Sequence, residues 1–208
     1  PELLKARFRA EQALQVVGNG YFCTRGADYE EEQGADSWGY AGTYFSTIRN
    51  TRKSVIDGQS VYNEDLVNCI NWLPITFKFD NGDWFHPHET ELLRYEKVLD
   101  FRNGCFTRTL CFRSQNGAET EVFARHCVSM ADKHLAAVEY CVTPINYSGV
   151  ITIKTGLHAD HINDGVARYA ELDQQHLSRI TEGGEQNGTS FVRVQTNPSR
   201  VPGKDLKP

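Results

Sequence analysis

The chain has 208 residues, of which 39% are hydrophobic and 11% aromatic, enough to form the core of one large domain. Acidic side chains number 27 and basic ones 22, and the formal net charge of -5 excludes general electrostatic attraction to nucleic acid or anionic membranes. No apolar run approaches the length of a membrane span, and the N-terminus has no signal-peptide pattern. We therefore expect a cytoplasmic globular protein that binds neutral ligands.

Turn signals separate short strand-like segments along most of the chain. The dipeptide Asn-Gly, which favours two-residue hairpin loops, occurs at Asn19-Gly20, Asn81-Gly82, Asn103-Gly104, Asn116-Gly117 and Asn187-Gly188. After the third of these turns the apolar spacing has period two, with Phe106, Leu110 and Phe112 on one face and Thr107, Thr109 and Cys111 on the other. This pattern predicts many antiparallel strands that each bury one face.

Taken in chain order, the elements are mostly strands. Helical spacing is present only in Leu3 to Val17 and in Gly165 to Ile180, and the acidic run from Glu30 to Glu32 is interpreted as a solvated loop. A hairpin is expected from Leu73 to Phe79 through a turn at Asp80 to Asp83 into Trp84-Phe85, and further strands from Glu121 to Met130, His134 to Thr143 and Val150 to Thr155. The spacing of these segments favours one all-β domain, a large antiparallel sandwich with few short helices.

Neither the cysteines nor the histidines form a recognisable reactive or metal-binding motif. The six cysteines contain no Cys-x-x-Cys pair, so we expect buried free thiols. His86 and His88 form one cluster, and His158 and His161 lie with Asp160 and Asp164, but neither set has the three or four ligands that zinc needs. We expect no metal, no organic cofactor and no catalytic residue, because serine-elbow and paired-carboxylate patterns are also missing.

Sugar recognition is the chemistry that fits the remaining exposable side chains. Aromatic rings stack on the C–H faces of a pyranose, while amides and guanidinium groups bind its hydroxyls. The candidate substrate-binding residues are Arg25, Trp38, Tyr44, Asn71 and Trp72. Structural alternatives remain open: Trp72, like Trp84, fits a β-sheet core, and Arg25 fits an ion pair.

Several ordered blocks resemble the N-terminal domain of glycoside hydrolase family 65. They are Gly18 to Gly26, Ala41 to Phe45, Glu64 to Phe77, Val98 to Arg108, Val128 to Ala137 and Gly165 to Tyr169, and they extend over nearly the whole chain. The sequence departs from the family pattern at Cys23, at Cys69-Ile70 and at Ser46 to Arg49. These departures weaken any inference about which sugar the domain would contact.

The resemblance implies a fold and a parent enzyme. The fold would be a galactose mutarotase-like supersandwich, so residues 1–208 would be a single N-terminal domain of a longer enzyme whose catalytic (α/α)6 barrel is absent here. The parent would be a phosphorylase or hydrolase of α-linked glucose disaccharides such as maltose, trehalose, kojibiose and nigerose. Inorganic phosphate would be the co-substrate of a phosphorylase, and the parent is expected to be a homodimer.

Within that parent the resemblance gives this chain a non-catalytic role. It would act as scaffold, pocket wall and oligomer surface, with its own C-terminal barrel and the disaccharide as partners, and we expect the chain alone to be inactive. Two alternatives stay open: a freestanding carbohydrate-binding module and a mutarotase-like sugar epimerase.

Overall fold

In the computed structural model the described residues form one α-helix and fifteen β-strands. The structure describes residues 2–30, 39–87, 90–160, 162–163, 169–178, 182–201 and 204–205. The helix is α1 (Glu2–Leu14), and the strands are β1 (Val17–Gly18), β2 (Phe22–Thr24), β3 (Thr43–Phe45), β4 (Arg49–Ile56), β5 (Gln59–Leu66), β6 (Ile75–Phe79), β7 (Glu91–Asp100), β8 (Cys105–Arg113), β9 (Glu119–Val128), β10 (Ala136–Pro144), β11 (Ile151–Thr155), β12 (Glu182–Gln186), β13 (Thr189–Arg193), β14 (Arg200–Val201) and β15 (Lys204–Asp205).

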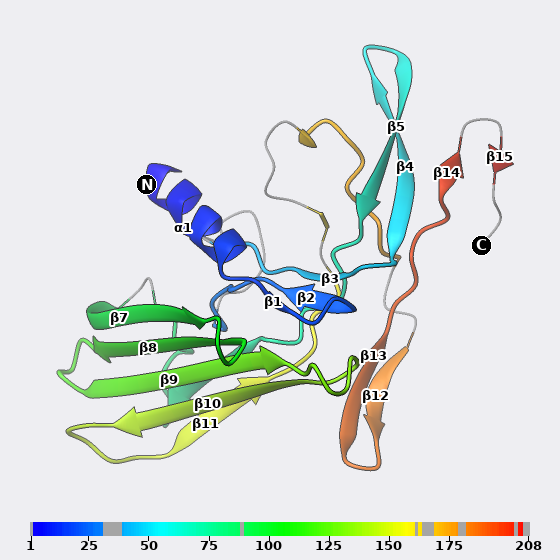
Figure 1. Cartoon of the computed structure of the whole chain (residues 1–208). Helices are drawn as coiled ribbons and strands as arrows, with labels where there is room; N and C mark the ends of the chain where they lie inside the picture. The colour runs from blue at the N-terminus through cyan, green and yellow to red at the C-terminus, as the bar shows by residue number, and fades with distance from the viewer. Residues whose placement is uncertain are drawn as a thin grey trace.

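The largest sheet is antiparallel and has the order β10-β9-β8-β7 (Figure 1). Along β8 every second residue from Phe106 to Phe112 is buried, as the period-two pattern predicted. The inner face of the main sheet packs on the two-stranded sheet of β6 and β11, with Phe77, Phe85 and Val122 in the shared core. These two layers confirm the all-β sandwich.

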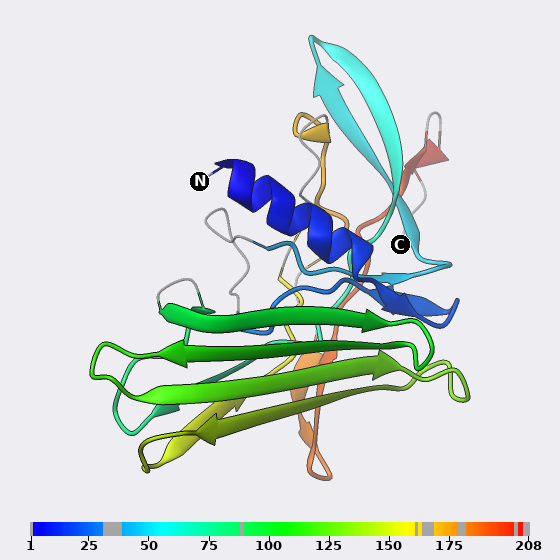
Figure 2. The same ribbon diagram turned by 60° about the vertical axis from the view of Figure 1, so that its left-hand side comes forward.

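Helix α1 lies over the β7 side of the main sheet, as both ribbon views show (Figure 2). Phe8 of the helix lies beneath the ammonium group of Lys97 in β7, with the nitrogen 4.4 Å from the ring centroid. The helix expected over residues 3–17 is confirmed, although it ends at Leu14. The second expected helix is wrong for the described residues 169–178, which are turns and irregular chain apart from an isolated bridge at Leu177.

Two hairpins have tight turns with positive φ at both central residues. Asn187 and Gly188 join β12 to β13, with φ values of 53° and 73°. Asp57 and Gly58 join β4 to β5, with φ values of 49° and 76°, although no Asn-Gly signal marks that turn. Both have the backbone of the mirror-image turns that two-residue hairpin loops favour.

The expected hairpin from Leu73 to Phe85 forms only in part. β6 pairs with β11. Phe85 contacts β6 through its N–H, which donates to the Phe77 carbonyl oxygen (2.8 Å), and through its carbonyl oxygen, which accepts from the Thr76 hydroxyl (3.0 Å). Positive φ falls on Asp80 (46°) and not on the Asn81-Gly82 dipeptide. The turn therefore starts one residue earlier than the dipeptide indicates.

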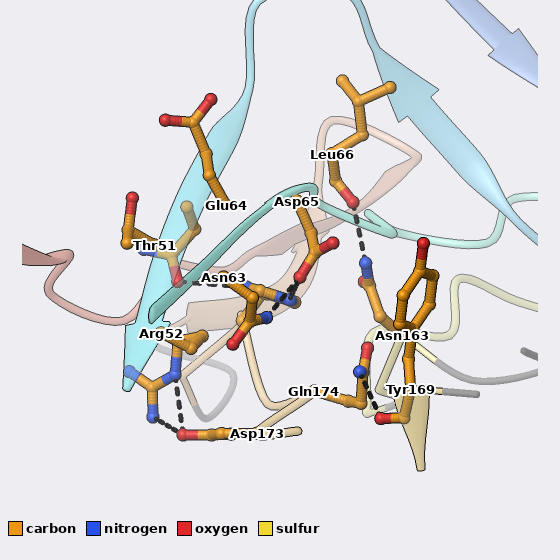
Figure 3. A network of polar contacts seen from close by, with 12 residues as sticks. Thr51, Arg52, Asn63, Glu64, Asp65, Leu66, Asn163, Tyr169, Asp173 and Gln174 are labelled. Carbon is orange, nitrogen blue, oxygen red and sulfur yellow. Dashed lines mark hydrogen bonds and ion pairs between the residues drawn. The ribbon is translucent and has the colours of Figure 1, made fainter. Parts of the chain in front are cut away.

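The β4–β5 hairpin extends away from the sandwich, and a polar network with Asn163 and with residues 173–176 holds it near its base (Figure 3). Arg52 binds Asp173 through its Nε (2.9 Å) and its terminal nitrogen (2.6 Å). The Asn163 amide donates to the Leu66 carbonyl oxygen (2.7 Å). The buried His176 also contacts this hairpin, with 3.3 Å between its Nε2 and Oδ2 of Asp65.

All six cysteines are free. Cys69 is buried and Cys141 is exposed, while the other four are half-buried. Burial raises the pKa of the Cys69 thiol to about 11, so it stays protonated at neutral pH. The thiols are unpaired in this structure, but the expectation that they are buried holds only for Cys69 and is wrong for the other five.

Candidate functional site

A group of charged side chains is buried between the main sheet and the loop that follows β2. Arg108 projects inward from β8 and is fully buried. One of its terminal nitrogens lies 3.0 Å from Asp28 and 2.7 Å from Glu30, and the other contacts the second oxygen of Glu30. Lys97 of β7 adds a second cation, 3.1 Å from Asp28. Two carboxylates and two cations thus leave this cluster without formal net charge.

Tyrosine hydroxyls complete the shell around these carboxylates. Tyr95 donates to both oxygens of Asp28 (2.9 and 3.0 Å), and Tyr140 donates to Glu30. Burial, reinforced by the nearby carboxylates, raises the pKa of both phenols, so they remain donors. Burial alone would raise the pKa of Asp28, but the charges of Lys97 and Arg108 outweigh it and hold that pKa below its usual value. Asp28 is therefore ionised at neutral pH.

His126 of β9 lies beside this cluster and is also fully buried. Its Nδ1 is hydrogen-bonded to the Tyr29 hydroxyl at 2.6 Å, and its ring and that of Trp72 form a T-shaped pair with a centroid distance of 5.9 Å. Burial lowers the pKa of His126 to about 4, so the ring is neutral near pH 7. Among the described residues, neither its Nε2 nor the indole N–H of Trp72 has a hydrogen-bond partner.

A pocket of about 390 Å³ opens at the edge of the same region. Three chain segments meet there: the loop after β2, the segment that leads into β6, and the end of β11. Asn71 and His158 fix two of these segments to each other through reciprocal backbone hydrogen bonds (2.8 and 2.9 Å). The lining residues are Tyr29, Glu30, Asn71, Pro74, Ile75, Thr76, Lys154, Thr155, Gly156, Leu157 and His158.

The five candidate sugar-binding residues do not meet at one place. Asn71 lines the pocket, and its side-chain oxygen accepts a hydrogen bond from the Leu73 N–H (3.1 Å). Trp72 is half-buried and packs against the buried cluster of Tyr29, Leu73, Ile75 and Ala124. Trp38 lies outside the described residues.

Arg25 and Tyr44 belong to a separate group near helix α1. Arg25 donates to the carbonyl oxygen of Arg9 in the helix (3.1 Å), and its guanidinium lies 5.0 Å from the centroid of the Tyr40 ring. Tyr44 donates to the Tyr40 hydroxyl at 3.5 Å. These contacts join the helix to the small β1–β2–β3 sheet, and a role in sugar binding stays a prediction for both residues.

A second pocket, of about 580 Å³, lies near the turn that joins β8 to β9. Its aromatic lining includes Trp84, whose ring is approached by the ammonium groups of Lys78 (5.2 Å) and Lys154 (5.4 Å). The stacked rings of Phe77, Phe85 and Phe112 form part of the lining too. Trp84 is half-buried, so it is neither a core residue nor fully open to solvent.

Sequence reasoning missed Glu30, Arg108, His126 and Tyr140. One signal was available for Arg108, which has the same parity as Phe106 and Leu110 and must therefore face the core with them. Glu30 was interpreted as solvated because it begins an acidic run, but it is 3% exposed. A run of acidic residues gives no information about a cation that a distant strand supplies, so the burial of Glu30 beside Arg108 does not follow from the local sequence.

The described histidines form no metal site. His88, His161 and Asp164 lie outside the described residues, and within the described part no three His, Cys, Asp or Glu side chains are arranged to hold an ion. In the part of the chain that the structure describes, no helix is long and apolar enough to cross a bilayer.

Comparison with known proteins places these features in a family. The sequence model of the glycosyl hydrolase family 65 N-terminal domain matches residues 2–203. An uncharacterized glycosyl hydrolase of Mycobacterium tuberculosis is 36% identical over 93% of this chain, and that match extends over 14% of the relative. Kojibiose phosphorylase of Halothermothrix orenii is 26% identical over 91% of this chain and 22% of its own length. The chain therefore spans less than a quarter of the length of these relatives.

A solved structure has the same fold. That protein carries the name "Putative kojibiose phosphorylase from human microbiome". It superposes with a TM-score of 0.72 over 92% of this chain and 24% of its own length. The sequence identity is 16%, so the likeness concerns the fold alone.

Proposed function

Because this chain belongs to glycosyl hydrolase family 65 as its N-terminal domain, we propose that it is the non-catalytic β-sandwich of a longer disaccharide phosphorylase or hydrolase. The observation that carries the proposal is the match over residues 2–203, together with relatives several times longer than the chain. Residues 1–208 would then be one domain, and its main partner would be a C-terminal catalytic barrel of the same polypeptide.

The chemistry of the buried cluster supports a scaffolding role. Cleavage of a glycosidic bond needs a carboxylic acid that holds a proton and can reach the substrate. Asp28 is buried, ionised and bound by two cations, and Glu30 is closed in by Arg108 and Tyr140. Neither carboxylate is available as that acid, so the proposal assigns catalysis to the barrel.

Exposed apolar side chains support a docking surface at one end of the main sheet. The turn between β7 and β8 and the loop between β9 and β10 lie at that end because the strands are antiparallel. Phe101 in the turn is 90% exposed, and Met130 and Leu135 in the loop are 80% and 57% exposed. Such neighbouring apolar residues mark surfaces that another domain or subunit covers. We assign this end to contact with the barrel or with the second subunit of a homodimer.

The substrate assignment follows from the relatives. Kojibiose phosphorylases and trehalose phosphorylases are among them, so an α-linked glucose disaccharide with inorganic phosphate as co-substrate is the proposed reaction pair of the whole enzyme. The proposal places this chemistry in the cytoplasm. In this chain Arg25, Trp38, Tyr44, Asn71 and Trp72 remain the residues proposed to contact sugar, with the pocket beside Asn71 as the structural candidate for a wall of the site.

The epimerase alternative is less well supported. It needs a glutamate and a histidine that can reach the ring oxygen and the anomeric hydroxyl of a sugar. His126 is hydrogen-bonded to Tyr29, the residue that precedes Glu30 in the chain. Both His126 and Glu30 are buried, however, and Glu30 is already paired with Arg108. A freestanding carbohydrate-binding module remains an outcome of the experiment below.

The test compares the longer protein that contains this chain with the 208-residue chain alone. Each is incubated with kojibiose, trehalose, maltose or nigerose in phosphate buffer, and glucose 1-phosphate release is measured. We expect phosphate-dependent turnover of one disaccharide by the longer protein and none by the chain. Turnover or accelerated glucose anomerisation by the chain alone would contradict the proposal. Tight disaccharide binding by a chain whose reading frame does not continue would favour the freestanding module.

A further inference from the structure

Four of the six cysteines lie on the outer face of the main sheet, and two of these face each other. Cys105 of β8 and Cys127 of β9 are direct cross-strand partners in the antiparallel register. Cys111, on the same face of β8, is opposite Glu121 in β9 and Arg94 in β7, and Cys141 of β10 is opposite Phe123. Cys105 and Cys127 are therefore the only thiols paired across adjacent strands in the described register.

The backbone hydrogen bonds show which kind of cross-strand pair this is. In the β8–β9 turn the Ser114 N–H donates to the Ala118 carbonyl oxygen (2.9 Å), so residues 114 and 118 form a hydrogen-bonded pair. Hydrogen-bonded and non-hydrogen-bonded pairs alternate along an antiparallel ladder. The register between β8 and β9 runs without a shift, so the pair of Cys105 and Cys127 is non-hydrogen-bonded.

The other edge of β9 gives the same answer independently. There the Ser129 N–H donates to the Leu135 carbonyl oxygen (2.9 Å), and the alternation makes Cys127 and Ala137 a hydrogen-bonded pair. The backbone groups of Cys127 therefore point to β10 and away from Cys105. Non-hydrogen-bonded partners have Cα atoms about 4.5 Å apart, within the range of about 4.4–6.8 Å that disulfides span.

The two thiols are also close enough to influence each other. Burial and the neighbouring Cys127 thiol raise the pKa of Cys105, whose Sγ additionally contacts the Asn103 carbonyl oxygen at 3.4 Å. Both residues are half-buried on the outer face, so a small reagent can reach them without opening the core.

We propose that Cys105 and Cys127 form a dithiol site that closes to an intramolecular disulfide when it meets a small disulfide oxidant such as oxidised glutathione. One cysteine thiolate attacks the oxidant, forming a mixed disulfide and releasing one glutathione thiol. The second cysteine thiolate then attacks the protein sulfur of that mixed disulfide, which forms the cross-strand bond and releases the second glutathione. Two protein thiols are oxidised, one glutathione disulfide is reduced, and the two thiol protons pass to the two glutathione thiolates.

The sequence allows a direct readout by peptide mapping. Cleavage after Lys and Arg puts each of the six cysteines in a different peptide, with Cys105 in residues 103–108, Cys111 in residues 109–113 and Cys127 in residues 126–133. The chain is incubated with oxidised glutathione, remaining thiols are alkylated, and the digest is analysed without reductant. We expect the 103–108 and 126–133 peptides to be joined.

Variants and thermal unfolding complete the test. Cys105→Ser and Cys127→Ser should each abolish the cross-link, while Cys111→Ser, the matched control on the same strand and face, should keep it. Closing the hairpin should raise the Tm of the oxidised wild type and of Cys111→Ser by about 5–10 °C and leave the other two variants unchanged. Recovery of Cys105 and Cys127 as separate alkylated or glutathione-bearing peptides, or a link from either to a different cysteine, would overturn the proposal.

Discussion

Arg108 and Glu30 face each other with two nitrogens against two oxygens, and both side chains are fully excluded from solvent. They come from a central strand and from a loop 78 residues earlier in the chain. This pair joins the loop after β2 to the inner face of the main sheet. The loop in turn contributes Tyr29 and Glu30 to the pocket beside Asn71, so the ion pair fixes one wall of that pocket.

Replacing Arg108 with Met should strongly destabilise the chain. The substitution keeps much of the side-chain volume but leaves Asp28 and Glu30 buried with only Lys97 as a cation. Loss of one partner from a buried ion pair costs about 3–5 kcal/mol. The free energy of unfolding, measured in urea, should fall by that amount.

The matched control is Arg125→Met. Arg125 pairs with Glu139 at 2.7 Å, but both side chains are about half exposed, at 52% and 47%. Exposed pairs contribute at most about 1 kcal/mol. Similar losses in the two variants would show that burial does not set the strength of the Arg108 cluster.

Stability should fall as the pH drops below neutrality, because His126 resists protonation in the folded state. Its pKa is about 4 in the fold and 6.5 for an unperturbed histidine side chain, so the unfolded chain binds a proton first. The stabilisation from a neutral His126 is complete above pH 6.5 and is lost as the pH falls towards 4, by at most ~3 kcal/mol. Urea unfolding at several values between about pH 7.5 and about pH 4.5 measures how the free energy of unfolding depends on pH.

The variant His126→Gln tests the assignment. It removes the titrating ring but keeps a polar group that can pair with Tyr29. The free energy of unfolding should therefore fall less steeply as the pH drops. Some dependence of stability on pH will remain, since burial also lowers the pKa of His176 despite the nearby Asp65. An unchanged slope in His126→Gln would assign the pH dependence to other groups.

The fold was predictable because its signals are local. Alternation along β8 and β9 identifies strands and their buried faces, and Asn187-Gly188 fixes one hairpin turn. The spacing of Val166, Tyr169, Leu172 and Leu177 suggested a helix, but Leu177 is held by an isolated bridge to Thr196, a partner that the local pattern does not reveal. Long-range pairing overrode the local pattern there.

The candidate site was less predictable because its contacts join distant segments. Asn71 was identified from its chemistry, but the pocket beside it depends on Tyr29 and His158, which reach it from separate loops. The burial of Glu30 depends on Arg108 and Tyr140. Such contacts require the strand order, which single-sequence periodicity does not provide.

Gly42→Ala should disturb the group formed by Arg25, Tyr40 and Tyr44. An added Cβ would lie 2.6 Å from a ring carbon of Tyr44 and 2.9 Å from Cδ of Arg25, so at least one side chain must move. Overpacking of this kind costs about 1–3 kcal/mol. Gly156→Ala is the control, because its Cβ would meet no atom of the described chain within 4 Å. Equal urea midpoints for the two variants would contradict the close packing around Gly42.

Arg52→Met should loosen the β4–β5 hairpin from the segment around Asp173. Arg52 makes two bonds to that carboxylate, and the two side chains are only 17% and 30% exposed, so about 1–3 kcal/mol of local stability should be lost. Arg49→Met in the same strand is the control, because its contact with Glu64 is 3.8 Å long and more than half exposed. Hydrogen exchange of the β4 and β5 amides should accelerate in Arg52→Met and stay near wild type in Arg49→Met. If both variants exchange alike, the polar network of Figure 3 does not anchor the hairpin.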